Sequence, residues 1–250
     1  MGMAMEVLAG FVTNASTTLT AQTVSPGDSM TVRNAAPNSD IWLLNMWGKH
    51  ATAGKLRLRS PRMHDNVNGY QPEVTASDAT PLMPVKYNQK LFSQDALILE
   101  STSGAADSSA SAILLYYKDI PGLAARLATP DFIDAHMTNL LTVQISPISS
   151  GTLGTWASAL ALNSASGQDN LKANTDYGVI GYMVNTACTA VAFKGPDTGN
   201  LRVGGPGIVT EREFTARWFQ WLSEQTGLPC MPIINSANKA GTTFDAVSNT

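Results

Sequence analysis

Apolar and polar residues alternate in short runs that recur every 8 to 15 residues along the chain. Glycine, proline, asparagine, aspartate and serine separate the runs, and stretches such as KLRLR and SMTVR alternate with a period of two. This spacing is typical of an all-β sandwich or barrel. In the first half it predicts strands at Leu19–Thr23, Ser29–Arg33, Ile41–Trp47, Lys55–Arg59, Leu97–Ser101 and Ala110–Tyr117. In the second half it predicts strands at Leu140–Ile145, Trp156–Leu162, Tyr177–Met183, Thr189–Phe193, Leu201–Val203, Met231–Ile234 and Thr242–Val247.

One stretch, TEREFTARWFQWLSEQTGLP, has the spacing of an amphipathic helix. Thr210 and Glu213 have the spacing of a capping box, Gly227 suits a left-handed C-cap, and Pro229 blocks continuation. We expect an apolar stripe of this helix to pack on a sheet, and its residues are Phe214, Trp218, Trp221 and Leu222.

A second helix is predicted near the midpoint, where Thr129 can act as N-cap and Pro130 occupies the first helical position. We interpret this region as a linker. The predicted division is therefore an N-terminal domain at 1–119, a helical linker at 120–139 and a C-terminal domain at 140–250.

The two halves carry similar segments in the same order. GKLRLRSP aligns with GNLRVGGP, and the matched turn or repeat positions are Gly54, Leu56, Arg57 and Pro61 in the first copy and Gly199, Leu201, Arg202 and Pro206 in the second. DIWLLNMW aligns upstream with DYGVIGYM, and Ala96–Tyr117 aligns downstream with Pro229–Asn249. A candidate helix at Pro84–Gln94 takes the place of Glu211–Gln225. We therefore expect two tandem β-domains, each with a short helix before its last two strands.

The glycine-rich stretch GPDTGNLRVGGPG invites comparison with a phosphate-binding loop. It lacks the lysine of the G-x-x-x-x-G-K-[ST] motif and the strand-to-helix context of G-x-G-x-x-G, so we interpret its glycines as turns around a short strand. PGDSM resembles the start of a GDS-type serine hydrolase, but that chemistry requires a histidine base, and Pro-Gly-Asp is a common turn.

Other candidate chemical groups are scattered. His50, His64 and His136 lie far apart in the sequence, without a metal-binding motif. Acidic residues lie at the predicted helix N-terminus or in predicted turns without a calcium-binding ladder, and the turn residues are Asp107, Asp197 and Asp245. We expect no enzyme, no metal and no cofactor.

Composition points to a surface that suits self-association. Charged residues make up 14% of the chain, against roughly 25% in ordinary globular proteins. The net charge is −3, and the densest basic stretch comprises Lys55, Arg57, Arg59 and Arg62. It lacks the interleaved aromatics of a nucleic-acid footprint, so no sequence-specific nucleic-acid partner is expected.

The cysteine and tryptophan positions leave alternatives open. Cys188 and Cys230 are either buried apolar residues or one bridge, and we expect synthesis in a reducing cytoplasm. Five tryptophans pack in a core or between subunits, or form a carbohydrate platform. Strand parity places Trp42 and Trp47 on opposite faces, which leaves one of them free to face outward.

This organisation resembles the double jelly-roll major capsid proteins of membrane-containing icosahedral viruses, of the tectivirus and corticovirus kind. The resemblance covers nearly the whole chain as an architecture, and its carriers are the repeated G[KN]LR…P elements, the helix at Thr210–Gly227 and the paired last strands. It implies an all-β fold of two tandem jelly-roll sandwiches.

The resemblance also implies a structural protein of the virion. Such a protein forms homotrimers whose six jelly rolls make a pseudo-hexameric unit of an icosahedral shell, after synthesis in the host cytoplasm. Its expected partners are its own copies, minor capsid or penton proteins and an internal membrane. Two alternatives stay open: a phage head decoration or cement protein, and a tandem carbohydrate-binding β-sandwich module.

Overall fold

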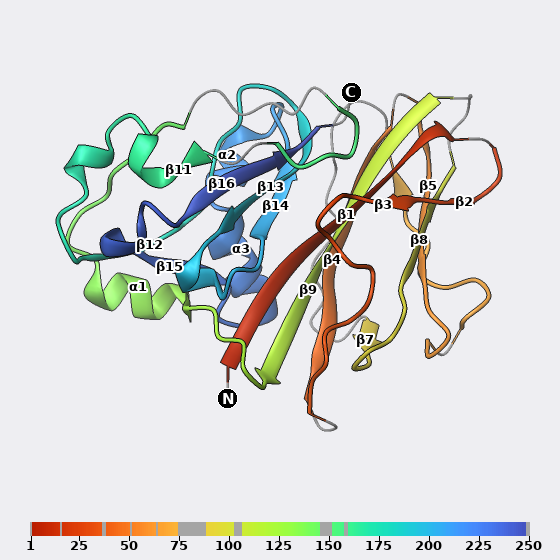
Figure 1. Cartoon of the computed structure of the whole chain (residues 1–250), viewed down its shortest axis with the longest axis horizontal. Helices are drawn as coiled ribbons and strands as arrows, with labels where there is room; N and C mark the ends of the chain where they lie inside the picture. The colour runs from red at the N-terminus through yellow and green to blue at the C-terminus, as the bar shows by residue number, and fades with distance from the viewer. Residues whose placement is uncertain are drawn as a thin grey trace.

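The computed structural model describes residues 2–15, 17–36, 39–50, 52–63, 65–74, 89–102, 107–145, 152–157 and 160–248 (Figure 1). The predicted β-rich class is confirmed, since 41% of the described residues lie in strands and 15% in helices. The N-terminal half contains β1 (Gly2–Ala15), β2 (Thr20–Ala21), β3 (Thr23–Val24), β4 (Ile41–His50), β5 (Gly54–Arg59), β6 (Glu73–Val74), β7 (Gln89–Leu91), β8 (Ile98–Ser101) and β9 (Asp107–Ile120).

In its described residues, the C-terminal half combines shorter strands with three α-helices. Its strands are β10 (Leu127–Ala128), β11 (Leu160–Ala161), β12 (Asp176–Gly178), β13 (Cys188–Lys194), β14 (Val203–Gly207), β15 (Met231–Asn235) and β16 (Thr243–Val247). Its helices are α1 (Pro130–His136), α2 (Arg212–Thr215) and α3 (Trp218–Thr226).

The strands of the N-terminal half pair like a long hairpin folded back on itself. Apart from β3, the first strand pairs with the last, the second with the next to last, and so on inward: β1 with β9, β2 with β8, β4 with β7, and β5 with β6. Two further pairs, β4 with β9 and β5 with β8, complete two sheets. Their strand orders are β3-β1-β9-β4-β7 and β2-β8-β5-β6.

The C-terminal half repeats most of this pairing. β11 pairs with β16, β12 with β15, β13 with β14, and β13 also with β16. These six strands correspond to β1, β2, β4, β7, β8 and β9 of the first half. Among the described residues β5 and β6 have no counterpart, and β10 pairs with β15 in the place that β5 takes beside β8.

This correspondence corrects the predicted repeat. The downstream alignment places β8 and β9 over β15 and β16, as the pairing does. GKLRLR, however, is β5, whereas β14 begins only at Val203 and takes the position of β7. Leu201 and Arg202 lie before the strand, and Gly199 is a left-handed residue that ends a 3₁₀ turn. The two G[KN]LR…P segments are therefore not equivalent in the fold.

The glycines at 204–207 lie in strand β14, not in turns as predicted. A Cβ on Gly204 would lie 1.8 Å from the Val191 carbonyl oxygen, and one on Gly205 would lie 2.2 Å from Nε1 of Trp218. Pro206 fits because β14 is the last strand of its sheet and its pairing with β13 is irregular at that point. Glycine is used here for close approach of the backbone to a strand and an indole.

We expect Gly204→Ala to destabilise the protein by about 1 to 3 kcal/mol or more, because the added methyl group meets backbone that must move apart. Gly241→Ala is the matched control. Its Cβ would have no neighbour closer than 3.6 Å, and we expect a change within about 0.5 kcal/mol. Urea unfolding of both variants measures the difference, and equal stabilities would contradict the tight approach at β14.

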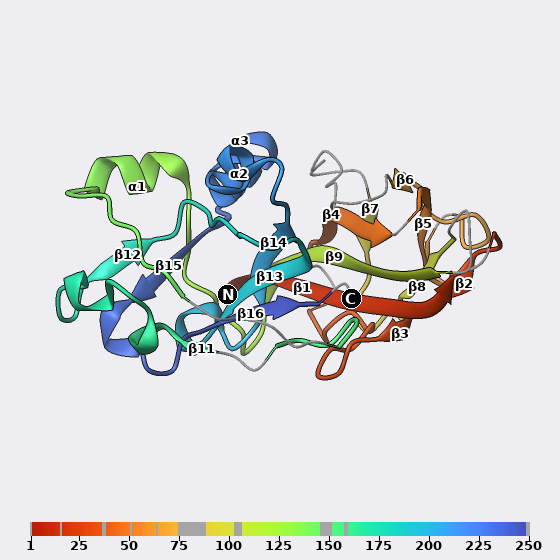
Figure 2. The same cartoon turned by 90° about the horizontal axis from the view of Figure 1, so that it is seen from above.

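The sheet β3-β1-β9-β4-β7, which we call the central sheet, lies between the sheet β2-β8-β5-β6 and the C-terminal half (Figure 2), and both of its faces are buried. Met5, Val7 and Ala9 of β1 face a large core that includes side chains of β13, β14 and α3. Ala4 and Leu8 face a second core shared with β5 and β8. The large core thus takes residues from both sides of the predicted linker. The domain boundaries at 119 and 140 stay a prediction.

This double burial explains why strand β1 was not predicted. Its sequence, GMAMEVLAGFVTNA, is almost continuously apolar because both faces are covered, so it lacks the alternation of a half-buried strand. By contrast, seven predicted strands are confirmed as β4, β5, β8, β9, β13, β15 and β16.

Several other predicted strands are shorter or absent. Leu19–Thr23 divides into β2 and β3, Tyr177–Met183 shortens to β12, and Trp156–Leu162 shortens to β11 within its described part. Ser29–Arg33 and Leu140–Ile145 are reduced to isolated bridges, Thr31 with Ala96 and Gln144 with Ser166.

The parity assignment of the tryptophans in β4 is wrong. The register against β9 shifts between Leu43 and Asn45, which is a β-bulge. Trp42, Leu44 and Trp47 consequently share one face and belong to the same core. Neither indole faces outward, since Trp42 is 7% and Trp47 0% exposed.

The predicted helices are partly confirmed. Thr129 caps α1 through its hydroxyl, which accepts from the Phe132 N–H, and Gly227 ends α3 with φ 65°. The N-cap predicted at Thr210 is displaced by one residue, because α2 begins at Arg212 and its N-cap is Glu211, whose side chain makes no capping hydrogen bond. In Pro84–Gln94, residues 84–88 lie outside the described residues and 89–91 form β7, so this helix is not formed there.

The helix predicted at Thr210–Gly227 is interrupted between α2 and α3. The chain at 180–182 runs against this break: the Ile180 carbonyl accepts from the Phe219 N–H, and the Tyr182 N–H donates to the Thr215 carbonyl. A Cβ on Gly181 would lie 2.3 Å from the Thr215 oxygen. These contacts also explain why the strand predicted at Tyr177–Met183 ends at Gly178, because the chain leaves the sheet to meet the helices.

Candidate functional site

The residues with catalytic or metal-binding chemistry do not converge. Within the described ranges, no three His, Cys, Asp or Glu side chains are grouped so as to hold a metal ion. His50 is buried in β4, His136 ends α1, and His64 lies outside the described residues. Ser29 follows a turn in which Gly27 has φ 85°, as predicted for the PGD segment.

Two of the acidic residues assigned to turns, Asp197 and Asp245, have structural partners. Asp197 lies in a 3₁₀ turn and accepts from the Asn235 N–H and the Asn238 side-chain amide, both at 2.9 Å. Asp245 lies in strand β16, not in a turn, and Asp107 begins β9.

The two cysteines do not form a disulfide. Cys230 is fully buried beside the Thr226 hydroxyl, and burial raises the pKa of its thiol to about 12. Such a thiol stays protonated and unreactive at neutral pH.

The basic stretch of β5 belongs to an ion-pair network on the sheet. Arg57 and Arg59 both pair with Glu100 of the neighbouring strand β8. Burial alone would raise the pKa of Glu100, but bonds from the two guanidinium groups outweigh it and hold the pKa below its usual value. Two of the four basic residues therefore share one carboxylate within the sheet, which weakens the interpretation of this stretch as a nucleic-acid site.

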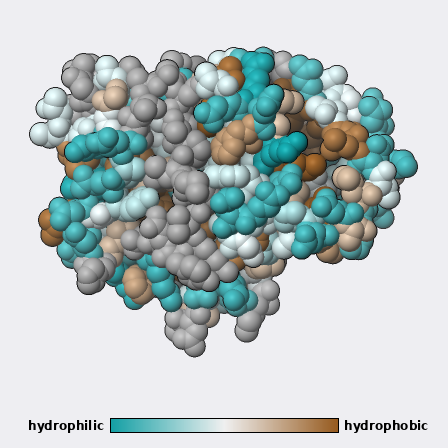
Figure 3. Space-filling view, turned by 180° about the vertical axis from the view of Figure 1, so that it is seen from behind, coloured by the Kyte–Doolittle hydropathy of each residue, from teal (hydrophilic) through white to brown (hydrophobic). Residues whose placement is uncertain are grey.

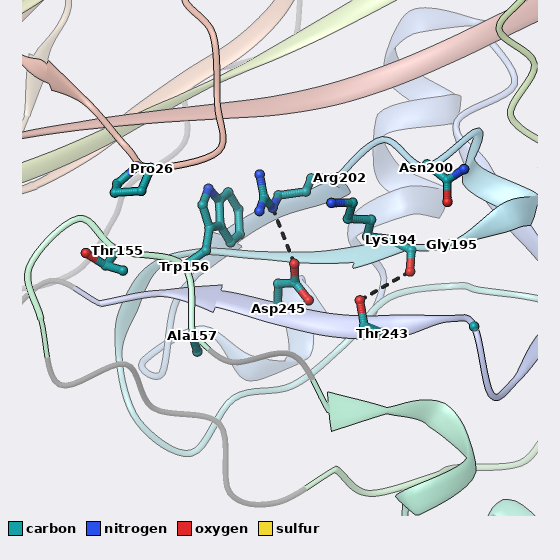
Figure 4. A pocket seen from close by; sticks show the side chains of 11 residues that line it. Pro26, Thr155, Trp156, Ala157, Lys194, Gly195, Asn200, Arg202, Thr243 and Asp245 are labelled. Atoms are coloured by element: carbon teal, nitrogen blue, oxygen red, sulfur yellow. Dashed lines mark hydrogen bonds and ion pairs between the residues drawn. The ribbon is translucent and has the colours of Figure 1, made fainter.

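A cluster of buried charged side chains lies where the two halves meet, and Figure 4 shows two of its members, Arg202 and Asp245. Arg202, which precedes β14, pairs with Asp28 of the N-terminal turn at 2.6 Å and with Asp245 of β16 at 3.3 Å. All three side chains are at least 86% buried, with exposures of 14%, 2% and 5% respectively. We call these three residues together with Trp156 the junction cluster.

Trp156 completes the junction cluster. Its Nε1 donates to the second oxygen of Asp28 at 2.9 Å, and the Arg202 guanidinium lies 4.5 Å from its ring centroid. The Ala9 N–H donates to the same Asp28 oxygen. Desolvation raises the pKa of Asp28, while the bonds from Trp156 and Ala9 and the charge of Arg202 act in the opposite direction.

Backbone hydrogen bonds and core contacts also join the two halves. The Val7 N–H of β1 donates to the Arg202 carbonyl at 2.8 Å. Trp47 Nε1 donates to the Thr189 carbonyl of β13 at 2.7 Å, and its ring meets that of Trp218 edge to face, with centroids 6.0 Å apart. Trp218 and Leu222 are buried in this core, and Phe214 and Trp221 pack against it.

Exposed apolar side chains gather in the C-terminal half, which lies at the right of the rear view in Figure 3. Among the described residues, the exposed large hydrophobic side chains are Val67, Phe132, Met137, Leu140 and Met183. Three of them, Phe132, Met137 and Leu140, lie on α1 and just after it, and α1 has no buried residue. We call these three residues the α1 surface.

Comparison with known proteins does not assign this chain to a family. A scan against protein-family models gave no match, and neither did a search of the curated proteins. Among the described residues, no helix has both the length and the apolar character needed to cross a bilayer.

Proposed function

We propose that this chain is a major capsid protein whose copies assemble as pseudo-hexameric homotrimers into an icosahedral virion shell. In this proposal the fold is a double jelly roll: a complete roll in the first half and a shortened one in the second, whose described residues contain no counterparts of β5 and β6. Its partners are then its own copies, minor capsid or penton proteins and an internal membrane.

The strand pairing is the observation that carries the proposal. Pairing of first with last and second with next to last, divided over two sheets, is the arrangement of two Greek keys in a jelly roll. Viral capsid domains are one of the main uses of this architecture. The recurrence of six of its strands in the second half favours a tandem pair of rolls over a single roll with an appendage.

The surface supports a self-assembling role. A helix of seven residues is too short to be stable alone, and α1 has no fully buried side chain, although Ile133 packs partly against the large core. Its exposed phenylalanine and the following Met137 and Leu140 fit a surface that another subunit covers. The low charge of the chain agrees with large contacts between copies.

Assembly of the purified protein tests the proposal. We expect trimers with a six-sided outline in electron microscopy, and sheets or shells at higher concentration. The variant Phe132→Ser/Leu140→Ser should weaken assembly by about tenfold or more per side chain, because each loses apolar burial. Val67→Ser is the matched control, since Val67 and Leu140 are each 70% exposed but lie in different halves.

The outcomes separate the candidate functions. A protein that stays monomeric at high concentration contradicts a capsid role, and one that binds only to preformed heads is a decoration or cement protein. The carbohydrate module based on Trp42 and Trp47 loses its support, because both indoles are buried in the core.

A further inference from the structure

A hollow of about 410 Å³ lies beside the junction cluster, which is within the usual range for small-molecule sites (Figure 4). Its wall comes from distant parts of the chain: Pro26 from the N-terminal half, Thr155 and Trp156 from the segment before β11, and Lys194 and Asp245 from β13 and β16. The site therefore exists only in the folded chain.

The fixed charges around this hollow balance. Arg202 and Lys194 bring two positive charges and Asp245 one negative charge to the wall, and Asp28, which does not line the hollow, pairs with Arg202 and supplies the second negative charge. A cation entering the hollow would meet the two basic groups, and an anion would meet the Asp245 carboxylate. The charge balance thus favours a neutral ligand.

The wall of the hollow offers both a hydrogen-bond acceptor and hydrogen-bond donors to a ligand. Asp245 is 95% buried, and its Oδ1 has no hydrogen-bond partner, although its Oδ2 binds Arg202. Buried carboxylate oxygens normally accept a hydrogen bond. On the donor side, Lys194 makes no ion pair with any described residue, and the Asn200 side chain is exposed at the rim.

We propose that this hollow binds a neutral sugar unit, and we call it the junction pocket. Sugar hydroxyls both donate and accept, so one ring can donate toward Asp245 and accept from Lys194 and Asn200. The Trp156 indole and the Pro26 ring supply apolar wall for the C–H faces of the sugar. An inorganic anion satisfies only the donors and leaves Asp245 Oδ1 without a partner.

Saturation-transfer NMR with the whole protein tests this proposal. The probes are the methyl glycosides of glucose, galactose, mannose and N-acetylglucosamine, with glucuronate and inorganic phosphate as charged comparisons. We expect at least one neutral glycoside to bind more tightly than both charged probes. Lys194→Met and Asn200→Gly should each weaken that binding by about three- to tenfold, the effect of one lost hydrogen bond.

Two controls match these variants. Lys172→Met removes an exposed lysine of the same half that does not line the pocket. Asn174→Gly replaces another asparagine with positive φ, 51° against 58° at Asn200, so both glycine variants change the backbone alike. We expect both controls to bind like the parent protein.

Three results would overturn the proposal: no neutral glycoside binds, phosphate or glucuronate binds better, or the pocket variants bind as well as their controls. Because the readout does not involve assembly, these results leave the proposed capsid function untouched.

Discussion

Arg202→Met is expected to lower the free energy of unfolding by about 3 to 5 kcal/mol at neutral pH. The substitution leaves Asp28 and Asp245 buried without their cation, and an uncompensated buried charge is what makes a broken buried ion pair costly. It also removes the guanidinium from the Trp156 ring. Urea unfolding measures the loss.

The pH dependence of this loss has a defined sign. Burial raises the pKa of Asp28 above its ordinary 3.8, so the folded state binds this proton more readily than the unfolded state. Stability from Asp28 is therefore present at low pH and declines as the pH rises through the folded pKa. Removing Arg202 raises that pKa further, so the deficit should be smaller at pH 5 than at pH 7.

Arg212→Met is the matched control for this experiment. Arg212 is exposed on α2 and forms no ion pair with a described residue, so we expect a change within about 0.5 kcal/mol. If the two methionine variants lose equal stability, or if the deficit of Arg202→Met grows as the pH falls, the ion-pair account of the junction is wrong.

Trp47→Ala is expected to cost about 3 to 5 kcal/mol, because the indole is fully buried between the central sheet and the C-terminal half. Trp47→Phe keeps a ring in the core but leaves the Thr189 carbonyl without its 2.7 Å donor, for which we expect about 1 to 3 kcal/mol. Trp221→Ala, at the edge of the same core, should cost less than Trp47→Ala.

Trp47→Ala also tests whether the two halves fold independently. Since Trp47 belongs to a core shared by both halves, we expect fluorescence and circular dichroism to follow one coincident unfolding transition that shifts as a whole in Trp47→Ala. Two separate transitions, of which only the first shifts, would instead favour the predicted boundaries at 119 and 140.

Strands could be predicted where only one of their faces is buried and where they end at turn residues. KLRLR alternates because Leu56 and Leu58 face the core while the arginines lie at the surface, and this strand is β5. Strand β1 escaped prediction because its burial on both faces removes the alternation. Trp42 and Trp47 were assigned to opposite faces because strand parity does not register the bulge after Leu43.

The residues of the junction cluster could be predicted only in part. Arg202 was singled out as a repeat position, yet its partners Asp28 and Asp245 lie 174 and 43 residues away in the sequence. Sequence spacing cannot relate such distant residues when no motif joins them. Trp156 and Lys194 likewise line the same hollow only because distant chain segments meet there.

Local periodicity and backbone preference were enough to predict the β-rich class, seven of the strands, the cap of α1 and the left-handed end of α3. The strand order, the doubly buried sheet, the strand formed by GGPG and the junction cluster emerged only in the folded chain. Those features depend on which distant surfaces exclude water from each other. In the sequence, a glycine that allows a neighbouring strand to approach cannot be distinguished from a glycine that forms a turn. The difference lies in the tertiary contacts.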